Sequence, residues 1–143
     1  MAWVCHSAWL ERHFDGTQAL DLDGAGATTI NLGIVTEAVI DQDTDNLYTG
    51  LTPVATGTGW TGPVALSNLT CGLNGSNNLA FDADDPTDVA QDASGFTNGR
   101  SLVLYETVNN FILAHNIEAS AFGNVAGPIS ITLDVAGILV FNI

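Results

Sequence analysis

The sequence has no lysine and only two basic residues, Arg12 and Arg100, against 16 acidic residues. The net charge is therefore -14, and the pI is about 4.1. Proteins that bind nucleic acids neutralise phosphates with lysine and arginine, so this composition argues against a nucleic-acid partner. The same shortage of basic residues argues against docking on an anionic membrane surface.

The sequence has only two cysteines, and it has neither a long apolar run nor the features of a signal peptide. Cys5 and Cys71 have no metal-like spacing, and buried thiols are favoured over a disulfide. No apolar run reaches the roughly 18 residues of a transmembrane helix. The N-terminal segment lacks the basic start and apolar stretch of a signal peptide, so we expect synthesis in a cytoplasm.

Apolar residues make up 46% of the 143 residues, which excludes an ordinary disordered chain. Glycine, asparagine and aspartate mark frequent turns, whereas helix formers are few. We predict one mainly β domain over residues 1–143, an antiparallel sandwich or barrel with one short N-terminal helix. Residues 1–16 would form a helical N-terminal arm and residues 17–143 the β core.

The best helix candidate is residues 2–14. Trp3, Ser7, Leu10 and Phe14 share one face of such a helix, and Gly16 supplies a left-handed stop. Strands are predicted at residues 29–36, 64–70, 79–82, 101–106, 111–117, 129–135 and 138–143. The segments 101–106 and 111–117 form the clearest hairpin, while 82–99 is expected to be a loop and 41–62 a loop or two short edge strands.

Asp41, Asp43 and Asp45 have the spacing of the first three ligands of a calcium loop. Asn46 and Thr52 stand where that loop requires glycine and glutamate, so these aspartates are weak calcium candidates. A second acidic cluster over residues 82–88 is interpreted as a solvated loop.

No motif indicates catalysis, so we expect a protein that is not an enzyme and has no cofactor. His6 and His13 would share a helix face but lack a third ligand for zinc, and His115 is interpreted as an ordinary strand histidine. The chain has no Gly-x-Ser-x-Gly elbow and no phosphate loop.

Several stretches, taken in order, resemble a family of small structural proteins of tailed bacteriophages. They begin with Phe14-Asp15-Gly16 and the strand over residues 29–35, followed by Gly57-Thr58-Gly59-Trp60. The most specific stretch is Phe81-Asp82-Ala83-Asp84-Asp85-Pro86. It is followed by a predicted hairpin whose first strand contains three aliphatic residues followed by Tyr105. The chain departs from the family after this tyrosine, where Glu106 replaces a basic residue.

This resemblance implies a virion component, most plausibly a capsid decoration (cement) protein on the outer surface of the head. Its partners would be the major capsid protein and further copies of the chain, with a trimer favoured. Apolar and aromatic side chains are typical interface anchors. The interface candidates are Trp3, Trp9, Leu10, Phe14, Trp60, Ile138, Val140, Phe141 and Ile143.

Three alternatives belong to other classes. A tail, baseplate or fibre module would contact a host receptor with the loops 41–62 and 82–99. A polysaccharide hydrolase would need carboxylates that converge in a cleft. A calcium-stabilised adhesive domain would depend on the aspartates of residues 41–45.

Overall fold

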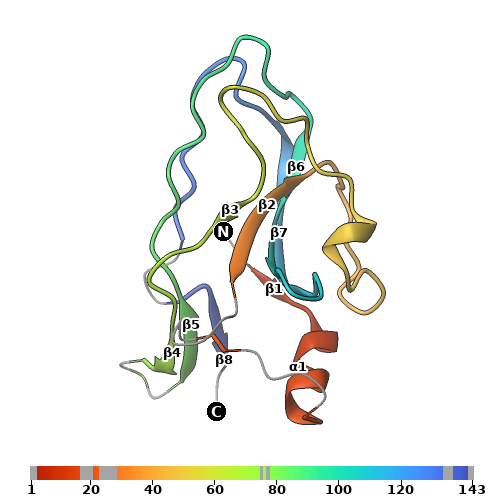
Figure 1. Ribbon diagram of the computed structural model, residues 1–143, viewed down its shortest axis with the longest axis vertical. Helices are drawn as coiled ribbons and strands as arrows, with labels where there is room; N and C mark the ends of the chain where they lie inside the picture. The colour runs from red at the N-terminus through yellow and green to blue at the C-terminus, as the bar shows by residue number, and fades with distance from the viewer. Residues whose placement is uncertain are drawn as a thin grey trace.

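The computed structural model describes residues 3–16, 21–22, 29–74, 76, 78–133 and 137–141, and only the backbone of Val140 and Phe141 (Figure 1). The protein is mainly β, with antiparallel sheets and one short N-terminal helix, which confirms the predicted fold class. The elements in order are β1 (Val4–Cys5), α1 (Ser7–Phe14), β2 (Ile30–Val35), the 3-10 helix η1 (Tyr48–Gly50), β3 (Val64–Ala65), β4 (Thr70–Leu73), β5 (Leu79–Asp82), β6 (Gly99–Glu106), β7 (Ile112–Phe122) and β8 (Leu139–Phe141).

Two antiparallel sheets organise these strands. The larger sheet has the order β1-β7-β6-β2-β3, and the smaller one has the order β4-β5-β8. In the larger sheet β2 pairs with β6 along the whole length of β2, from Ile30 opposite Glu106 to Val35 opposite Ser101. In the smaller sheet β5 is central, pairing with β4 on one side and β8 on the other.

The larger sheet is buried on both faces, which explains the near-continuous apolar run of β6. Leu102 and Leu104 belong to the main core cluster, whereas Val103 and Tyr105 belong to a second cluster. Because successive side chains of a strand point to opposite faces, the two clusters lie on opposite faces of the sheet. The second cluster is covered by the segment that carries Tyr48, whose ring stacks on Tyr105 with centroids 3.9 Å apart.

The N-terminal helix is shorter than predicted. Val4 and Cys5 form β1, which pairs with His115 and Ala114 of β7, so the helix begins only at Ser7. His6 is extended, and its backbone N–H donates to the carbonyl of Leu113 over 2.9 Å. Edge pairing therefore outweighs the helical spacing of the first residues. The predicted stop is confirmed, since Gly16 has φ 76.

The strand pattern predicted the central strands well. β2 and β5 match the predicted segments 29–36 and 79–82, and the predicted hairpin is formed by β6 and β7. Within the described residues, the segment 41–62 contains η1 and isolated bridges but no strand.

Two predicted strands were wrong in the structure. The segment 64–70 is divided into β3 and the start of β4, with Asn68 between them in the left-handed region at φ 51. The described part of 129–135 forms one bridge, Ile129 to Val89, and no strand. Its alternation reflects burial of Ile131 and Leu133, while the backbone N–H of Leu133 donates to the Asp85 side chain over 2.6 Å.

The predicted C-terminal strand 138–143 is confirmed in part. β8 spans Leu139–Phe141, and Ile138 precedes it as a buried residue. Asn142 and Ile143 lie outside the described residues. Ala2, the first residue of the predicted helix, lies outside them as well.

We predict that Gly33→Ala destabilises the fold. A Cβ at Gly33 would lie 2.5 Å from the Tyr48 hydroxyl and 2.7 Å from the ring, so Tyr48 would have to leave its stack on Tyr105. Overpacking of this kind costs about 1–3 kcal/mol. Urea unfolding measures the change against Gly50→Ala, where no atom lies within 4 Å of the added Cβ. Equal losses from both substitutions would contradict the close packing at Gly33.

Candidate functional site

Three of the interface candidates lie inside the chain's own core. Trp9, Trp60 and Ile138 are 3%, 5% and 4% exposed, respectively. The Trp9 indole N–H also donates to the carbonyl of Leu113 over 2.9 Å. Their apolar surface therefore stabilises this fold, and little of it is accessible to a partner.

The remaining candidates divide into partly buried, exposed and undescribed side chains. Trp3 and Leu10 are partly buried against the main core, whereas Phe14 is 82% exposed at the end of α1. The side chains of Val140 and Phe141 and the whole of Ile143 lie outside the described residues. Among the described candidates, Phe14 offers the largest exposed fraction.

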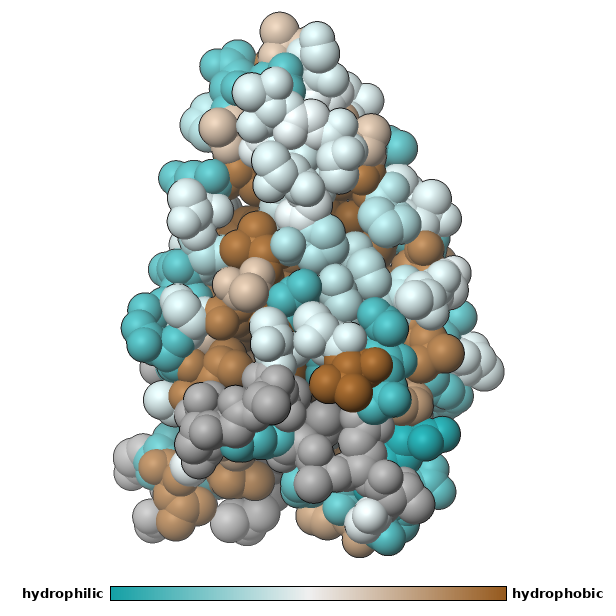
Figure 2. Space-filling model, in the orientation of Figure 1, coloured by the Kyte–Doolittle hydropathy of each residue, from teal (hydrophilic) through white to brown (hydrophobic). Residues whose placement is uncertain are grey.

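Sequence reasoning missed two exposed leucines at the same end of the molecule. Leu73 of β4 and Leu79 of β5 are 67% and 37% exposed, and their backbones are paired across the sheet. Figure 1 shows α1 and the β4-β5-β8 sheet together at one end, and Figure 2 shows brown, apolar atoms over the smaller sheet. Every residue of β4 is exposed, and the hydropathy of the sequence did not reveal this exposure.

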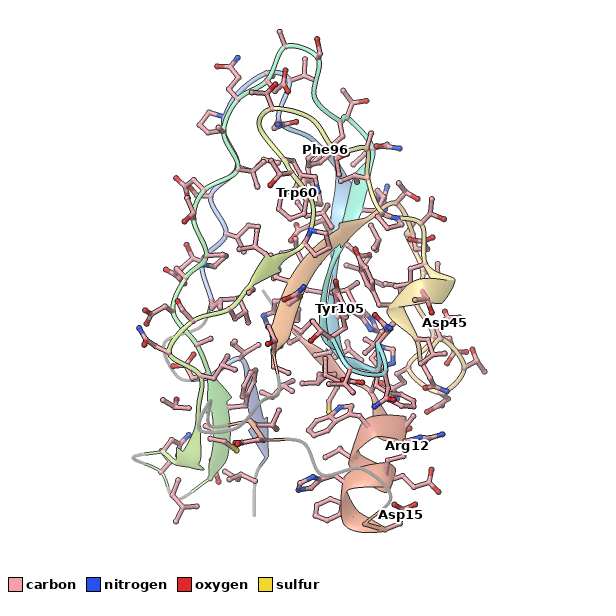
Figure 3. The ribbon with its side chains drawn as sticks, viewed as in Figure 1. Arg12, Asp15, Asp45, Trp60, Phe96 and Tyr105 are labelled. Carbon is pink, nitrogen blue, oxygen red and sulfur yellow. The ribbon has the colours of Figure 1, made fainter. Side chains whose placement is uncertain are left out.

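The opposite end is built from polar loops that Asn124 holds together. This side chain is fully buried, accepting the backbone N–H of Phe96 over 3.1 Å and donating to the carbonyl of Ala90 over 2.9 Å. Its own backbone N–H donates to the Phe96 carbonyl over 3.2 Å. The absence of a side chain at Gly95 provides the space for Asn124, because a Cβ at Gly95 would collide with the Asn124 amide. Trp60 and Phe96 fill the interior beside these loops (Figure 3).

The aspartates of residues 41–45 form a hydrogen-bonded turn. The Asp41 side chain accepts the backbone N–H of Asp43 over 2.9 Å, and the Asp45 side chain accepts that of Asp41 over 2.8 Å. Within the described residues, no group of three His, Cys, Asp or Glu side chains could hold a metal ion. The structure thus assigns Asp41 and Asp45 to backbone bonding and does not gather the three calcium candidates into a ligand set.

The second acidic cluster has a similar structural use, which the interpretation as a solvated loop missed. Asp84 accepts the Asn68 amide over 2.5 Å, and Asp85 accepts the backbone N–H of Leu133. Further along the same loop, Asp92 accepts the backbone N–H of Ser94 over 2.9 Å and that of Gly59 over 3.3 Å. These backbone bonds hold the pKa of Asp92 below its ordinary value.

Glu106 organises the turn between β6 and β7. Its side chain is fully buried, and its carboxylate accepts backbone N–H groups from Val108, Asn109 and Phe111 over 2.7–3.1 Å. Asn110 completes the turn at φ 63. The departure from the bacteriophage pattern at this position therefore carries a defined structural role here.

His6 and His115 form a buried pair, and His13 lies apart from them on α1. The Nε2 of His6 is 2.7 Å from the Nδ1 of His115, and the rings meet edge to face. Burial lowers the pKa of both rings, and His115 adds to the effect on His6, whose pKa falls to about 4. The nearby carboxylates of Asp41, Asp43 and Asp45 act in the opposite direction on His6.

The two cysteines lie on strands of different sheets and differ in exposure. They form no disulfide with each other. Cys5 is half-buried on β1, where burial raises the pKa of its thiol. Cys71 is exposed on β4, which corrects the expectation of a buried thiol at that position.

The chain matches no protein-family model, no curated protein and no solved structure. None of the described helices is long and apolar enough to cross a lipid bilayer.

We expect Glu106→Ala to destabilise the fold by about 3 kcal/mol, because three backbone donors of the turn lose their acceptor. Chemical denaturation followed by tryptophan fluorescence measures this loss. Glu11→Ala, which removes an exposed carboxylate from α1, is the matched control and should change stability little. A Glu106→Ala protein as stable as the control would show that water replaces the carboxylate at no cost.

The histidine pair predicts a loss of stability in mild acid. Both folded pKa values lie below the unfolded value of 6.5, so as the pH falls the unfolded chain takes up protons that the folded chain does not. The free energy of unfolding should therefore decrease between about pH 6.5 and 4, by roughly 3 kcal/mol for His6 alone.

Thermal unfolding between pH 7.5 and 4.5 measures this dependence in the native chain and in two variants. His6→Gln should flatten the profile, whereas His13→Gln, at an exposed position of α1, should leave it unchanged. A native profile that His6→Gln does not alter would assign the acid sensitivity to other groups.

Proposed function

We propose that the chain is a virion structural protein without enzymatic activity, a capsid decoration protein that binds between capsomers and stabilises the head. The observation that carries this proposal is the difference between the two ends of the molecule. One end exposes Phe14, Leu73 and Leu79, and the other is a polar set of loops fixed by buried hydrogen bonds. Figure 2 shows the loop end as mainly white and teal.

Such a difference suits a subunit that attaches by one end and faces solvent with the other. Exposed large apolar side chains gathered at one place mark interaction surfaces. Phe14 is an aromatic anchor of the type that dominates binding energy. The loops at the opposite end need to persist outside a cell, and Asn124 and Asp92 fix them through the backbone.

The charge of -14 supports an assembly that depends on salt. Like charges on neighbouring copies repel over about 10 Å at 0.1 M salt and over longer distances in dilute buffer. Homo-oligomers, with a trimer favoured, would therefore form more readily as the salt concentration rises. The resemblance to small structural proteins of tailed bacteriophages agrees with this proposal.

Immunogold labelling of virions from the phage that encodes the chain tests the location. We expect gold particles spread over the head. Label confined to the tail would instead favour the tail, baseplate or fibre module, and unlabelled intact particles would contradict a virion role.

Rebinding to particles that lack the protein tests the attachment surface. Phe14→Ser and Leu73→Ser should each lower occupancy, because each removes exposed apolar area at the attachment end. Val39→Ser removes an equally exposed side chain from the segment beside η1 and should leave occupancy unchanged. Equal occupancy for all three variants would rule out this end as the contact.

A further inference from the structure

β7 leaves the regular ladder over residues 118–121. Ser101 pairs with Ile117 and Gly99 pairs with Phe122, so a single residue of β6, Arg100, stands opposite four residues of β7. On the other side, the described residues of β1 pair with His115 and Ala114. Within the part of the chain that the structure describes, the segment 118–121 therefore has no paired residue in β6 or β1, and most of it is exposed.

A cavity of about 440 Å³ lies beside this unpaired segment. Residues 118–122 of β7 form one wall, residues 129–131 form another, and Leu102 of β6 contributes from the sheet. Leu102 and Ile131 are core residues, 2% and 3% exposed. The cavity thus opens onto the apolar core at the place where the sheet edge is unpaired.

Three buried N–H groups around this edge have no acceptor among the described residues. Asn116 is 4% exposed, its side-chain amide nitrogen has no partner, and it stands directly opposite Leu102. The Nε1 of Trp3 and the Nε of Arg100 are likewise buried and have no hydrogen-bond partner among the described residues. Trp3 precedes the Val4–His115 pair by one residue, so the antiparallel register continues toward Asn116.

These three N–H groups are covered by the chain itself, and none of their residues lines the cavity. A partner would instead use the backbone of residues 118–121. An extended polypeptide can pair with it at the repeat of a strand, and its alternate side chains can enter the cavity. A bulged, unpaired sheet edge is a common place for this mode of recognition.

Charge decides which polypeptide fits. Among the described residues that line the cavity, Glu118 is the one that carries a charge. A second copy of this chain offers two basic residues against 16 acidic ones, so pairing between copies would bring like charges together. A segment with lysine or arginine beside an aliphatic residue would complement both Glu118 and the cavity.

We propose that the edge formed by residues 118–122 of β7 binds an extended, basic segment of a different protein, with an aliphatic side chain in the cavity beside Leu102. The inference rests on the proposed function only for the identity of that partner, which would be the shell protein. The binding mode itself follows from the unpaired edge and the cavity.

Hydrogen exchange of the backbone amides, followed by NMR, tests this binding with peptides of defined composition. The probe is an eight-residue peptide of alternating valine and lysine with blocked ends. It should slow exchange at residues 118–121 by about tenfold or more at saturation. The same peptide N-methylated at alternate residues cannot form a ladder and should give no protection, and a valine–glutamate peptide should bind weakly.

Glu118→Lys tests the charge, with Glu11→Lys as its matched control on α1. Glu118→Lys should weaken the valine–lysine peptide by about tenfold, whereas Glu11→Lys should not. Equal protection by the N-methylated peptide, no protection by any peptide at millimolar concentration, or an unaltered affinity in Glu118→Lys would each overturn the proposal. Self-association that Glu118→Lys alters would overturn the assignment to a different protein.

These outcomes are separable from those of the proposed function. Peptide binding at β7 without gold on virions would leave the edge site standing and remove the virion role. Gold on the head without peptide binding would do the reverse.

Discussion

Backbone N–H groups that lie outside helices and strands need acceptors, and in this protein carboxylates and amides supply them. Glu106 serves three such groups in the hairpin turn, Asp92 serves two between loops, and Asn124 joins two further segments at the loop end. Unsatisfied buried donors are costly, so these side chains hold long irregular stretches in single conformations. The positions of both sheets' connecting loops depend on them.

The shortage of basic residues explains why carboxylates bond to backbone N–H groups in this protein. With two basic residues against 16 acids, most carboxylates cannot form ion pairs within the chain. A carboxylate can instead accept several backbone N–H groups, and such hydrogen bonds are stronger than those between neutral groups. The fully buried Glu106 carboxylate accepts three of them, which replace the water that it has lost.

Period-two patterns predicted the strands whose side chains face a core, namely β2, β5 and the β6–β7 hairpin. These patterns failed where a hydrogen bond from a side chain determines the conformation of the backbone. The alternation over residues 129–135 predicted a strand, but Asp85, 48 residues away, takes the Leu133 N–H. The helix start was wrong for a related reason, since β1 is fixed by pairing with the distant β7. Neither partner can be read from a local window of sequence.

The candidate site also could not be predicted from a local window of sequence. Trp9 and Trp60 are predicted anchors because aromatic side chains are typical of interfaces, but hydrophobicity does not distinguish a core residue from an interface residue. Only the fold separates them, and it leaves Phe14, Leu73 and Leu79 at the surface of one end. At residues 118–121 of β7 the fold also leaves backbone that the described parts of β6 and β1 do not pair. The partner proposed for this edge follows from that gap in the ladder and from the cavity beside it, and a local window of sequence predicts neither.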